Sequence, residues 1–417
     1  MKTNRVVILG ACGGIGSVAT RALLTSKLVD QVILADINEV ALGRLEDELA
    51  DNRVSSKVLD VTDRDSLLEI LGMGDVAVNC VGPFYKFGPP ILEASIDAGT
   101  DYVDICDDLD ATQSQLKLDN KAKDSGVRAL IGIGSSPGLA NVLVRFANDQ
   151  LLDEVVEVDI CHVHGGEAFE GPAVLKHRIH AMVNQVPVFV DGTFHDVMML
   201  EDSGARFAGD VDFGEVGVHR VYPYPHPETI TLPKTFPSLK RVTNRGCIFP
   251  RDYFELTMAH VRNGLASLSP IEVNGSQVIP LEFMVHHLIA VRPSLLSESK
   301  VDSPAGCLRV EVAGRKDGQW HQFVFLSGSQ SDGAGAGTGI PAALGAMLML
   351  EGNIKQVGVN PPEAVVDPAQ MIALAGDVVR SLGVGRQSSS INGLARIPLR
   401  IIHTGPDGTS QEVPFAI

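Results

Sequence analysis

A short apolar strand that runs into a glycine-rich turn constrains the fold of this chain more than any other feature. The run RVVILGACGGIG covers residues 5–16 and spaces Gly10, Gly13 and Gly16 as G-x-x-G-x-x-G. Glycine there permits a tight turn, close approach of the backbone to a pyrophosphate, and close packing of the next helix on the strand. The helix N-terminus then offers N–H donors to phosphates. We expect dinucleotide contacts at Gly10, Cys12, Gly13, Gly14, Ile15 and Gly16.

An acidic residue ends the next predicted strand. Asp36 lies in VILADI, 20 residues beyond Gly16, and is followed by Ile37 rather than by an arginine. A carboxylate at this position accepts hydrogen bonds from both ribose hydroxyls and repels a 2′-phosphate. The sequence therefore predicts NAD in preference to NADP, with Asp36 and Ile37 beside the ribose. The alternative is a glycine-rich turn that binds no ligand.

The first 135 residues alternate between apolar strands and amphipathic helices. The predicted strands are Arg5–Leu9, Gln31–Ala35, Val54–Leu59, Val76–Val81, Tyr102–Ile105 and Arg128–Ile133. This alternation predicts a parallel sheet covered by helices on both faces, with its ligand crevice beyond the carboxyl ends of the strands. Further cofactor contacts are expected after the third and fourth strands, at Asp60, Val61, Cys80, Val81, Gly82 and Pro83. An acid near a helix N-cap and an ordinary βα turn are the alternatives there.

The remainder of the chain departs from this alternation. Residues 155–164 read as a strand, 165–255 as sheet and loop with little helix, and 310–326 as a hairpin. The run GSQSDGAGAGTG, residues 328–339, predicts a flexible or ligand-facing loop, and an apolar helix follows over 341–351. We assign 1–136 and about 336–385 to a dinucleotide-binding domain and about 137–335 to a substrate and dimerisation domain. Residues 386–417 carry a C-terminal hairpin.

Charge and cysteine content exclude several classes of function. The chain has 51 acidic and 34 basic residues, a net charge of −17, which disfavours nucleic acid and anionic membranes as partners. No run of 18 apolar residues occurs, so no membrane span is expected. The six cysteines form no C-x-x-C pair or zinc framework, so we expect reduced thiols, no metal site and a cytoplasmic location.

Four segments resemble the saccharopine dehydrogenase-like family, which includes lysine 6-dehydrogenase and carboxynorspermidine dehydrogenase. The first is the glycine turn with Asp36, and the second is NCVGPFYKFGPPILEASIDAGTDYVDICDD, residues 79–108. The third is IGIGSSPGLANVLV, residues 131–144, and the fourth is GTGIPAALGAMLMLEGNIKQVGVNPPE, residues 337–363. Residues 150–330 match the family only loosely.

The resemblance implies an α/β fold and a reaction class. It implies a Rossmann-type parallel-sheet domain, interrupted by a second α/β or α+β substrate domain with a mixed or antiparallel sheet. The implied activity is NAD(P)-dependent hydride transfer at the C–N carbon of an amino acid, amine or imine, in a homodimer. Two alternatives remain. One is a transferase of the homospermidine synthase kind with tightly bound NAD, and the other is a non-enzymatic dinucleotide-binding partner.

Three residues are candidates for the acid–base and substrate-binding roles. His226 lies in the proline-pinned segment YPYPHPETITLP and is the candidate general base. Asp107 lies in an acidic cluster after the fifth strand and could hold a substrate ammonium, although a solvated acidic loop is equally consistent. Arg178 is a candidate clamp for a substrate carboxylate, and a surface position is the alternative.

Two pairs of histidines are spaced so that each could share one face of a secondary-structure element. His177 and His180 would do so on a helix, and His162 and His164 on a strand. No third ligand at a metal-site spacing accompanies either pair. A surface or loop role is therefore favoured for all four.

Overall fold

The computed structural model describes residues 3–329, 333–383 and 399–414. The described residues fall into two compact units. One comprises those in Met1–Asp153 and Gly335–Leu399, and the other those in Glu154–Ala334 and Arg400–Val413. The first unit contains a parallel sheet and the second a mixed sheet, so the predicted fold class is confirmed. Of the predicted C-terminal segment 386–417, residues 386–398 and 415–417 lie outside the described part of the chain.

The first unit is a doubly wound α/β domain. Its amino-terminal part contains β1 (Arg5–Leu9), α1 (Gly14–Leu24), β2 (Gln31–Asp36), α2 (Glu39–Leu49), β3 (Val54–Val58), α3 (Arg64–Leu71), β4 (Val76–Asn79), α4 (Phe84–Ala98), β5 (Asp101–Asp104), α5 (Leu109–Leu116), α6 (Asp119–Asp124), β6 (Arg128–Leu130) and α7 (Leu139–Phe146). A π-helical turn, Ala147–Leu151, follows α7. The chain returns with α13 (Gly333–Leu350), β17 (Gly358–Asn360), α14 (Pro362–Val365) and α15 (Pro368–Leu382).

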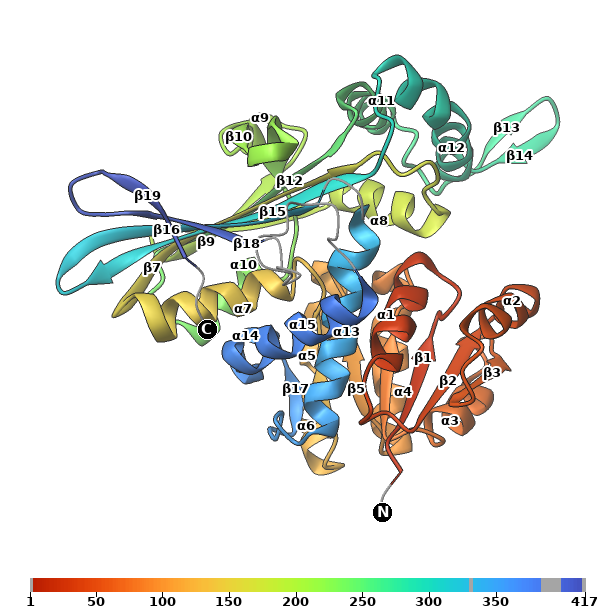
Figure 1. Cartoon of the computed structure of the whole chain (residues 1–417). Helices are drawn as coiled ribbons and strands as arrows, with labels where there is room; N and C mark the ends of the chain where they lie inside the picture. The colour runs from red at the N-terminus through yellow and green to blue at the C-terminus, as the bar shows by residue number, and fades with distance from the viewer. Residues whose placement is uncertain (1–2, 330–332, 384–398, 415–417) are drawn as a thin grey trace. The chain divides into compact units, whose positions relative to one another are not determined.

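The strands of this unit form a sheet in the order β17-β6-β5-β4-β1-β2-β3 (Figure 1). The strand pairs of this sheet are parallel. The strand order reverses between β1 and β4, and ligands of open parallel sheets bind at such a switch point. The turns after β1 and β4 therefore flank the expected ligand crevice.

Alternate residues of the strands enter two separate hydrophobic cores. Val6 and Ile8 of β1 join a core with α1, α2, α13 and α15. Val7 and Leu9 join a second core with α3, α4 and α6. Because successive strand residues point to opposite faces, a run such as RVVIL is apolar throughout only when both faces are covered. The sequence predicted this arrangement correctly.

The prediction of a loop over residues 328–339 is wrong, because the described part of that segment belongs to a strand and a helix. Strand β16 continues to Ser329, and α13 begins at Gly333, so only residues 330–332 between them lie outside the described chain. At Gly339 of α13, glycine serves close packing. A Cβ on Gly339 would lie 2.8 Å from the carbonyl oxygen of Ile15, so α13 can pack tightly on the start of α1 (Figure 1).

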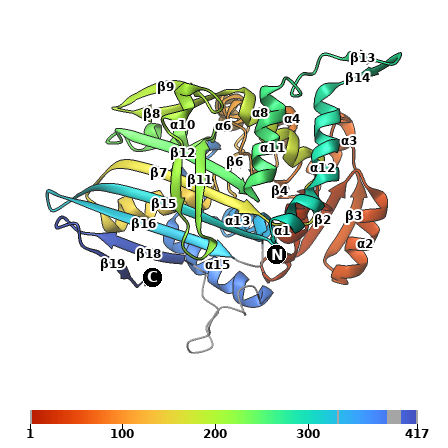
Figure 2. The ribbon, with the colours of Figure 1, turned by 90° about the horizontal axis from the view of Figure 1, so that it is seen from above.

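The second unit is built on a ten-stranded mixed sheet. Its path is β10-β11-β12-β7-β15-β16-β18-β19, with β8 pairing to β12 and β9 to β8. The strands are β7 (Glu154–Gly165), β8 (Gln185–Val190), β9 (Thr193–Met198), β10 (Gly209–Asp212), β11 (Val218–Pro223), β12 (Arg241–Phe249), β15 (Ala305–Lys316), β16 (Gln319–Ser329), β18 (Leu399–Thr404) and β19 (Ser410–Val413). Strands β12 and β7 are parallel, and both predicted hairpins, β15–β16 and β18–β19, are present (Figure 2).

Helices also occur where the sequence analysis expected sheet and loop. They are α8 (Pro172–Val183), α9 (Asp202–Ala205), α10 (Glu228–Thr235) and α11 (Arg251–Arg262), followed by the short hairpin β13 (Ile271–Val273) and β14 (Ser276–Val278) and by α12 (Pro280–Glu298). Glycine, proline and histidine obscured the helical periodicity of 165–255. Helices α8, α11 and α12 pack together over one core, where Leu175, Phe254 and Met284 are buried.

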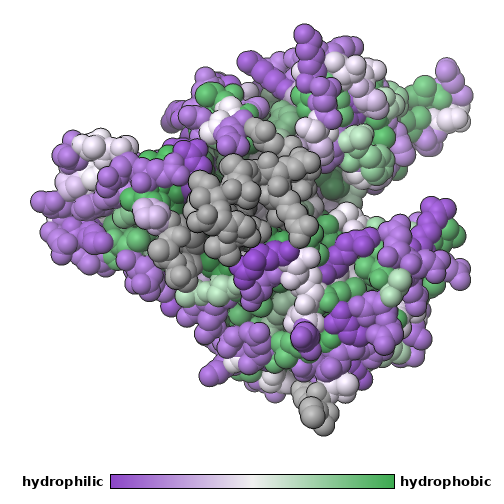
Figure 3. Space-filling model, in the orientation of Figure 1, coloured by the Kyte–Doolittle hydropathy of each residue, from purple (hydrophilic) through white to green (hydrophobic). Residues whose placement is uncertain are grey.

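Figure 3 colours one face of the molecule by hydropathy. The face drawn in Figure 3 is largely hydrophilic, with apolar residues scattered among polar ones. Within the described residues, no helix combines the length and the hydropathy that crossing a bilayer requires.

Candidate functional site

The turn after β1 leaves backbone exposed where a phosphate would approach. Gly10 has φ +74° and donates its N–H to the carbonyl oxygen of Ala35 at 2.8 Å. A Cβ on Gly16 would lie 2.2 Å from the carbonyl oxygen of Gly10, so only glycine lets α1 start this close to β1. A Cβ on Gly14 would meet nothing within 4 Å. Gly13 caps α1 without a side chain, so the first turn of the helix presents backbone to that open space.

Asp36 is anchored to this turn by two backbone hydrogen bonds. Its Oδ2 accepts from Cys12 N–H at 3.0 Å, and its Oδ1 accepts from Asn38 N–H at 3.0 Å. The carboxylate is therefore fixed at the end of β2, while Ile37 beside it is exposed. Burial, with Asp36 adding to it, raises the pKa of the Cys12 thiol to about 11. Cys12 therefore stays a neutral thiol at pH 7.

A buried polar network supports the loops after β4, β5 and β6. Asp104 is fully buried and accepts hydrogen bonds from the N–H of Gly132 at 2.7 Å, the Tyr102 hydroxyl at 2.9 Å and Gln115 Nε2 at 2.5 Å. Tyr102 in turn accepts from Asn79 Nδ2 at 2.9 Å, and Asn79 Oδ1 accepts from Val81 N–H at 2.9 Å. Burial raises the pKa of Asp104 above its ordinary value, although these bonds oppose the shift.

This network leads to the predicted contacts after β4. Cys80, Val81, Gly82 and Pro83 are half-buried between β4 and the N-cap of α4. Burial, with a contribution from Asp104, raises the pKa of Cys80 to about 12, so its thiol also stays neutral. The structure thus holds this loop next to the β1 turn, since a Cβ on Gly10 would lie 3.0 Å from the carbonyl oxygen of Cys80.

The three aspartates at the end of β5 differ in their surroundings. Asp104 belongs to the buried network, and Asp108 is buried and accepts from Tyr85 N–H at 2.8 Å at the start of α4. Asp107 lies between them in sequence and is half-buried.

The predicted contacts after β3 are closer to solvent. Val61 is half-buried, and the exposed Asp60 accepts from the N–H and hydroxyl of Thr62 at 2.9 and 2.7 Å. Those bonds lower the pKa of Asp60.

The second unit brings together histidines from β7, α8 and the segment before α10. His162 on β7 and His226, just before α10, stack with ring centroids 4.9 Å apart and an angle of 7° between planes. Tyr224 meets both rings edge-on, at 5.4 and 5.1 Å. His177 on α8 lies 6.5 Å from His226. His226 is only 4% exposed and His162 is half-buried, so the surface or loop role favoured for His162 is wrong.

A fully buried glutamate accompanies these rings. Glu228 opens α10 and its Oε2 lies 3.8 Å from His226 Nδ1. Asn244 on β12 links it to the other ring, with Nδ2 donating to Glu228 Oε1 at 3.3 Å and Oδ1 lying 3.1 Å from His162 Nε2. Burial, reinforced by His162, His177 and His164, holds the pKa of His226 well below its usual value. His226 is therefore a neutral imidazole at pH 7.

Arg178 has a carboxylate partner within the protein. Its two terminal nitrogens donate to Glu170 at 3.0 and 2.7 Å, and both side chains are buried. Arg292 approaches the same carboxylate at 3.0 Å, and the Tyr253 hydroxyl donates to it at 3.3 Å. Although burial opposes ionisation, Arg178 and Arg292 lower the pKa of Glu170 to about 2. Glu170 thus binds the Arg178 guanidinium, for which a substrate carboxylate had been the expected partner.

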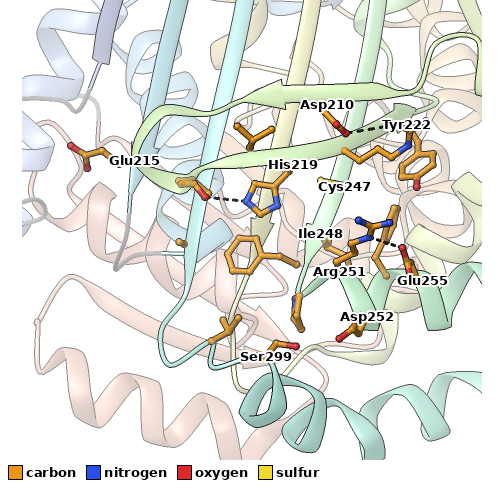
Figure 4. Close-up of a pocket in the computed structure, with 18 of the residues that line it drawn as sticks. Asp210, Glu215, His219, Tyr222, Cys247, Ile248, Arg251, Asp252, Glu255 and Ser299 are labelled. Carbon is orange, nitrogen blue, oxygen red and sulfur yellow. Dashed lines mark hydrogen bonds and ion pairs between the residues drawn. The ribbon is translucent and has the colours of Figure 1, made fainter.

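A separate pocket of about 780 Å³ lies beside β11, the end of β12 and α11 (Figure 4). Two arginines in its lining already have acidic partners. Arg251 pairs with Glu255 at 2.6 Å, and Arg220 pairs with Asp210 at 3.7 Å. His219 hydrogen-bonds the Val216 carbonyl at 3.0 Å. Arg251, Arg220 and His219 of this pocket are therefore engaged with acidic side chains or with backbone.

Sequence reasoning overlooked three residues of the histidine cluster. Asn244 and Gly246 alternate along β12 and face His162, and a Cβ on Gly246 would lie 2.0 Å from His162 Cε1. Glu228 was seen only as a neighbour of His226. The alternation of NRG within an apolar strand was the available signal, because a polar residue and a glycine two apart on a buried face mark a close approach.

Comparison with known proteins places the chain. Residues 6–130 match the family model described as the saccharopine dehydrogenase NADP binding domain. Carboxyaminopropylagmatine dehydrogenase of Synechocystis is 26% identical over 398 residues, covering 90% of this chain and 96% of that protein. Carboxynorspermidine synthase of Vibrio cholerae is 22% identical over 413 residues, with the same coverage.

A solved structure matches the whole fold. Apo saccharopine dehydrogenase (L-Glu forming) from Saccharomyces cerevisiae aligns with a TM-score of 0.64 over 99% of this chain and 100% of that chain, at 15% identity. The domain match, the glycine turn and this shared fold agree with one another. The first unit therefore carries a nicotinamide dinucleotide-binding domain, and over its whole length the chain is similar to saccharopine dehydrogenase-like oxidoreductases.

Proposed function

We propose that this protein transfers hydride to or from the carbon of a C–N bond in a carboxylated secondary amine or its imine. The glycine turn with its anchored Asp36 is the observation that carries the proposal, because it suits a dinucleotide and little else. The names of two relatives that align with 90% of the chain denote carboxylated amines, which supports this substrate class.

The first unit would hold the cofactor through backbone and one carboxylate. Gly10, Gly14 and Gly16 provide a cradle that side chains would fill, and α1 directs its N-terminus into it. Cys80–Pro83 would line the nicotinamide end of the crevice. The bound nicotinamide supplies the hydride chemistry, while the chain supplies position and charge.

NAD is the proposed cofactor in preference to NADP. Both oxygens of Asp36 are fixed by backbone N–H groups, so the carboxylate cannot swing away from a 2′-phosphate. Residue 37 is an exposed isoleucine, which offers that phosphate no positive charge. The matching domain is described as NADP-binding, so this preference is a specific departure that binding assays can test.

His226 is the proposed proton acceptor for the amine. Oxidation of an ammonium requires removal of a proton before or with the hydride, and a neutral imidazole performs that task. Burial keeps His226 neutral, and Glu228 beside it would stabilise the imidazolium after transfer. Asp107 is the proposed second acidic group, at the end of β5. Arg178, engaged by Glu170, would act indirectly by stiffening α8.

The test is reductive amination with the purified full chain. A panel of diamines and guanidinoamines is mixed with carboxyl-bearing aldehydes and either NADH or NADPH. Loss of reduced-nicotinamide absorbance, with a secondary amine found by mass spectrometry, is the expected result. Product formation with catalytic NAD and no net absorbance change would instead establish the transferase alternative. Thermal stabilisation by dinucleotide without turnover of any pair would contradict the enzymatic proposal.

We also propose that the protein is a cytoplasmic homodimer. The resemblance to the family suggests the dimer, and the reduced, scattered cysteines suit the compartment. Light scattering of the purified chain across a range of concentrations is the measurement for the dimer. A mass near 44.4 kDa at every concentration would contradict it.

A further inference from the structure

Asn244 fixes the protonation pattern of His162. The amide nitrogen donates to Glu228 Oε1, so the amide oxygen is the atom that faces His162 Nε2 at 3.1 Å. That oxygen can only accept, and therefore Nε2 of His162 must carry a hydrogen. Burial, with His164 adding to it, lowers the pKa of His162, so its Nδ1 carries none at pH 7. His162 is then a neutral Nε2–H tautomer.

The position of the His162 ring also depends on a glycine. Gly246 lies opposite His162 in the parallel β7–β12 pair, and any Cβ there would overlap the ring, with Cε1 at 2.0 Å and Nε2 at 2.4 Å. The ring therefore rests on bare backbone. The same ring stacks on His226, with the ring centroids 4.9 Å apart and an angle of 7° between the planes. A ring fixed by a hydrogen bond and by backbone leaves its stacked neighbour little freedom to rotate.

We propose that His162 and Asn244 are positioning residues that hold the imidazole of His226 in the plane required for proton transfer. This inference rests on the proposed base role of His226. The chain of contacts runs from Glu228 through Asn244 to His162 and across the ring stack to His226. Proton transfer needs a base held within hydrogen-bond reach and aligned with the proton, so loss of alignment lowers turnover without removing the base.

The groups around His226 in the second unit come from four elements. They are His162 and His164 on β7, His177 on α8, Tyr224 after β11 and Glu228 on α10. Tyr224 contacts His226 edge-on, and His177 is tilted by 46° at a longer distance. His162 alone among these rings lies parallel to His226. It is therefore the neighbour best placed to fix the orientation of that ring.

The first experiment needs no substrate. The full chain is labelled with ¹⁵N at its histidine rings, and resonances are assigned with His162→Phe and His226→Gln. The expected spectrum shows a neutral Nε2–H tautomer for His162, and replacing Asn244 by Leu should convert this ring to a mixture of tautomers. A dominant Nδ1–H tautomer, or an unchanged spectrum in Asn244→Leu, would overturn the inference even if the protein proved to have another activity.

The second experiment separates positioning from folding. His162→Ala should lower kcat at least tenfold and leave the Kd for dinucleotide unchanged, whereas His162→Phe keeps the stack and should recover most of the loss. Replacement of the exposed His195 by Ala serves as the matched control. Wild-type kcat in His162→Ala would overturn the inference, as would equal losses in the Ala and Phe variants at unchanged melting temperature. If the wild type has no turnover, the proposed function fails, and the tautomer measurement still decides on Asn244.

Discussion

The two units of this molecule provide chemistry in opposite ways. In the first, the site is made of backbone, with glycines clearing space and Asp36 as the main side chain. In the second, it is made of buried side chains that hold one another. All 12 histidines, from His162 to His403, belong to the second unit, and the first has none. The first unit therefore contains no imidazole that could gain a proton in acid, whereas every imidazole of the chain lies in the second.

The largest expected effect is on turnover, and it should separate the units. Replacing His226 by Gln removes the proposed base, so kcat should fall by about 100- to 10,000-fold. Dinucleotide affinity should stay unchanged, because the binding turn belongs to the first unit. Steady-state kinetics and calorimetric titration measure the two quantities. A loss in dinucleotide affinity of the same size would contradict the assignment of cofactor binding and proton transfer to different units.

A second prediction concerns backbone space in the first unit. Gly16→Ala places a Cβ 2.2 Å from a backbone oxygen, so the free energy of unfolding should fall by about 2 kcal/mol or more. Gly43 in α2 is the matched control, since a Cβ there meets open space. Alanine at that helical position should stabilise by about 0.5–1 kcal/mol. Urea unfolding measures both. Equal effects at the two glycines would contradict the geometry of the turn.

Acid should destabilise the second unit in particular. Burial lowers the folded-state pKa values of His162, His164 and His226, while the unfolded value stays near 6.5. The unfolded chain therefore binds more protons, and stability falls as pH drops below about 6.5, by up to about 1.4 kcal/mol per pH unit for each histidine. Trp320, the only tryptophan, lies on β16 and reports this unit by fluorescence. Equal unfolding midpoints at pH 7 and pH 5 would contradict the neutral, buried rings.

The smallest effect concerns cofactor choice. Replacing Asp36 by Ser removes the repulsion of a 2′-phosphate, so the ratio of NAD to NADP affinity should fall by about tenfold, or 1.4 kcal/mol. Asp47→Ser, at an exposed position of α2, is the control for the loss of one carboxylate from the same unit. A wild-type protein that prefers NADP would show that the carboxylate does not set the choice.

The first unit was predictable because its signals are local. Inner strands such as β1 and β4 are largely apolar on both faces, and the turn glycines follow the first strand directly, so period and motif agree. Asp36 could be placed for the same reason. The buried polar network that supports the loops after β4, β5 and β6 could not be predicted. Its members Asn79, Tyr102 and Asp104 look like ordinary strand residues until the fold brings them together.

The second unit resisted prediction because its contacts are distant in sequence. His162 meets Asn244 across 82 residues, and Tyr253 meets Glu170 across 83. The prediction for residues 328–339 failed for another reason. The glycines of this segment suggested a loop, whereas at Gly339 they allow one helix to approach another. Glycine marks both a turn and a close approach, and sequence alone does not separate them.

The most direct test of the account is dinucleotide binding by a Gly14→Ala variant. A Cβ at Gly14 meets nothing in the protein, so the variant should fold with an unchanged or slightly higher melting temperature. The same Cβ would stand where the phosphates approach α1, so affinity for NAD should fall by about tenfold or more, that is by 1.4 kcal/mol. Calorimetric titration of wild type and variant with NAD and NADP gives the answer. If both proteins bind equally well, the dinucleotide does not lie on this turn, and the central claim is wrong.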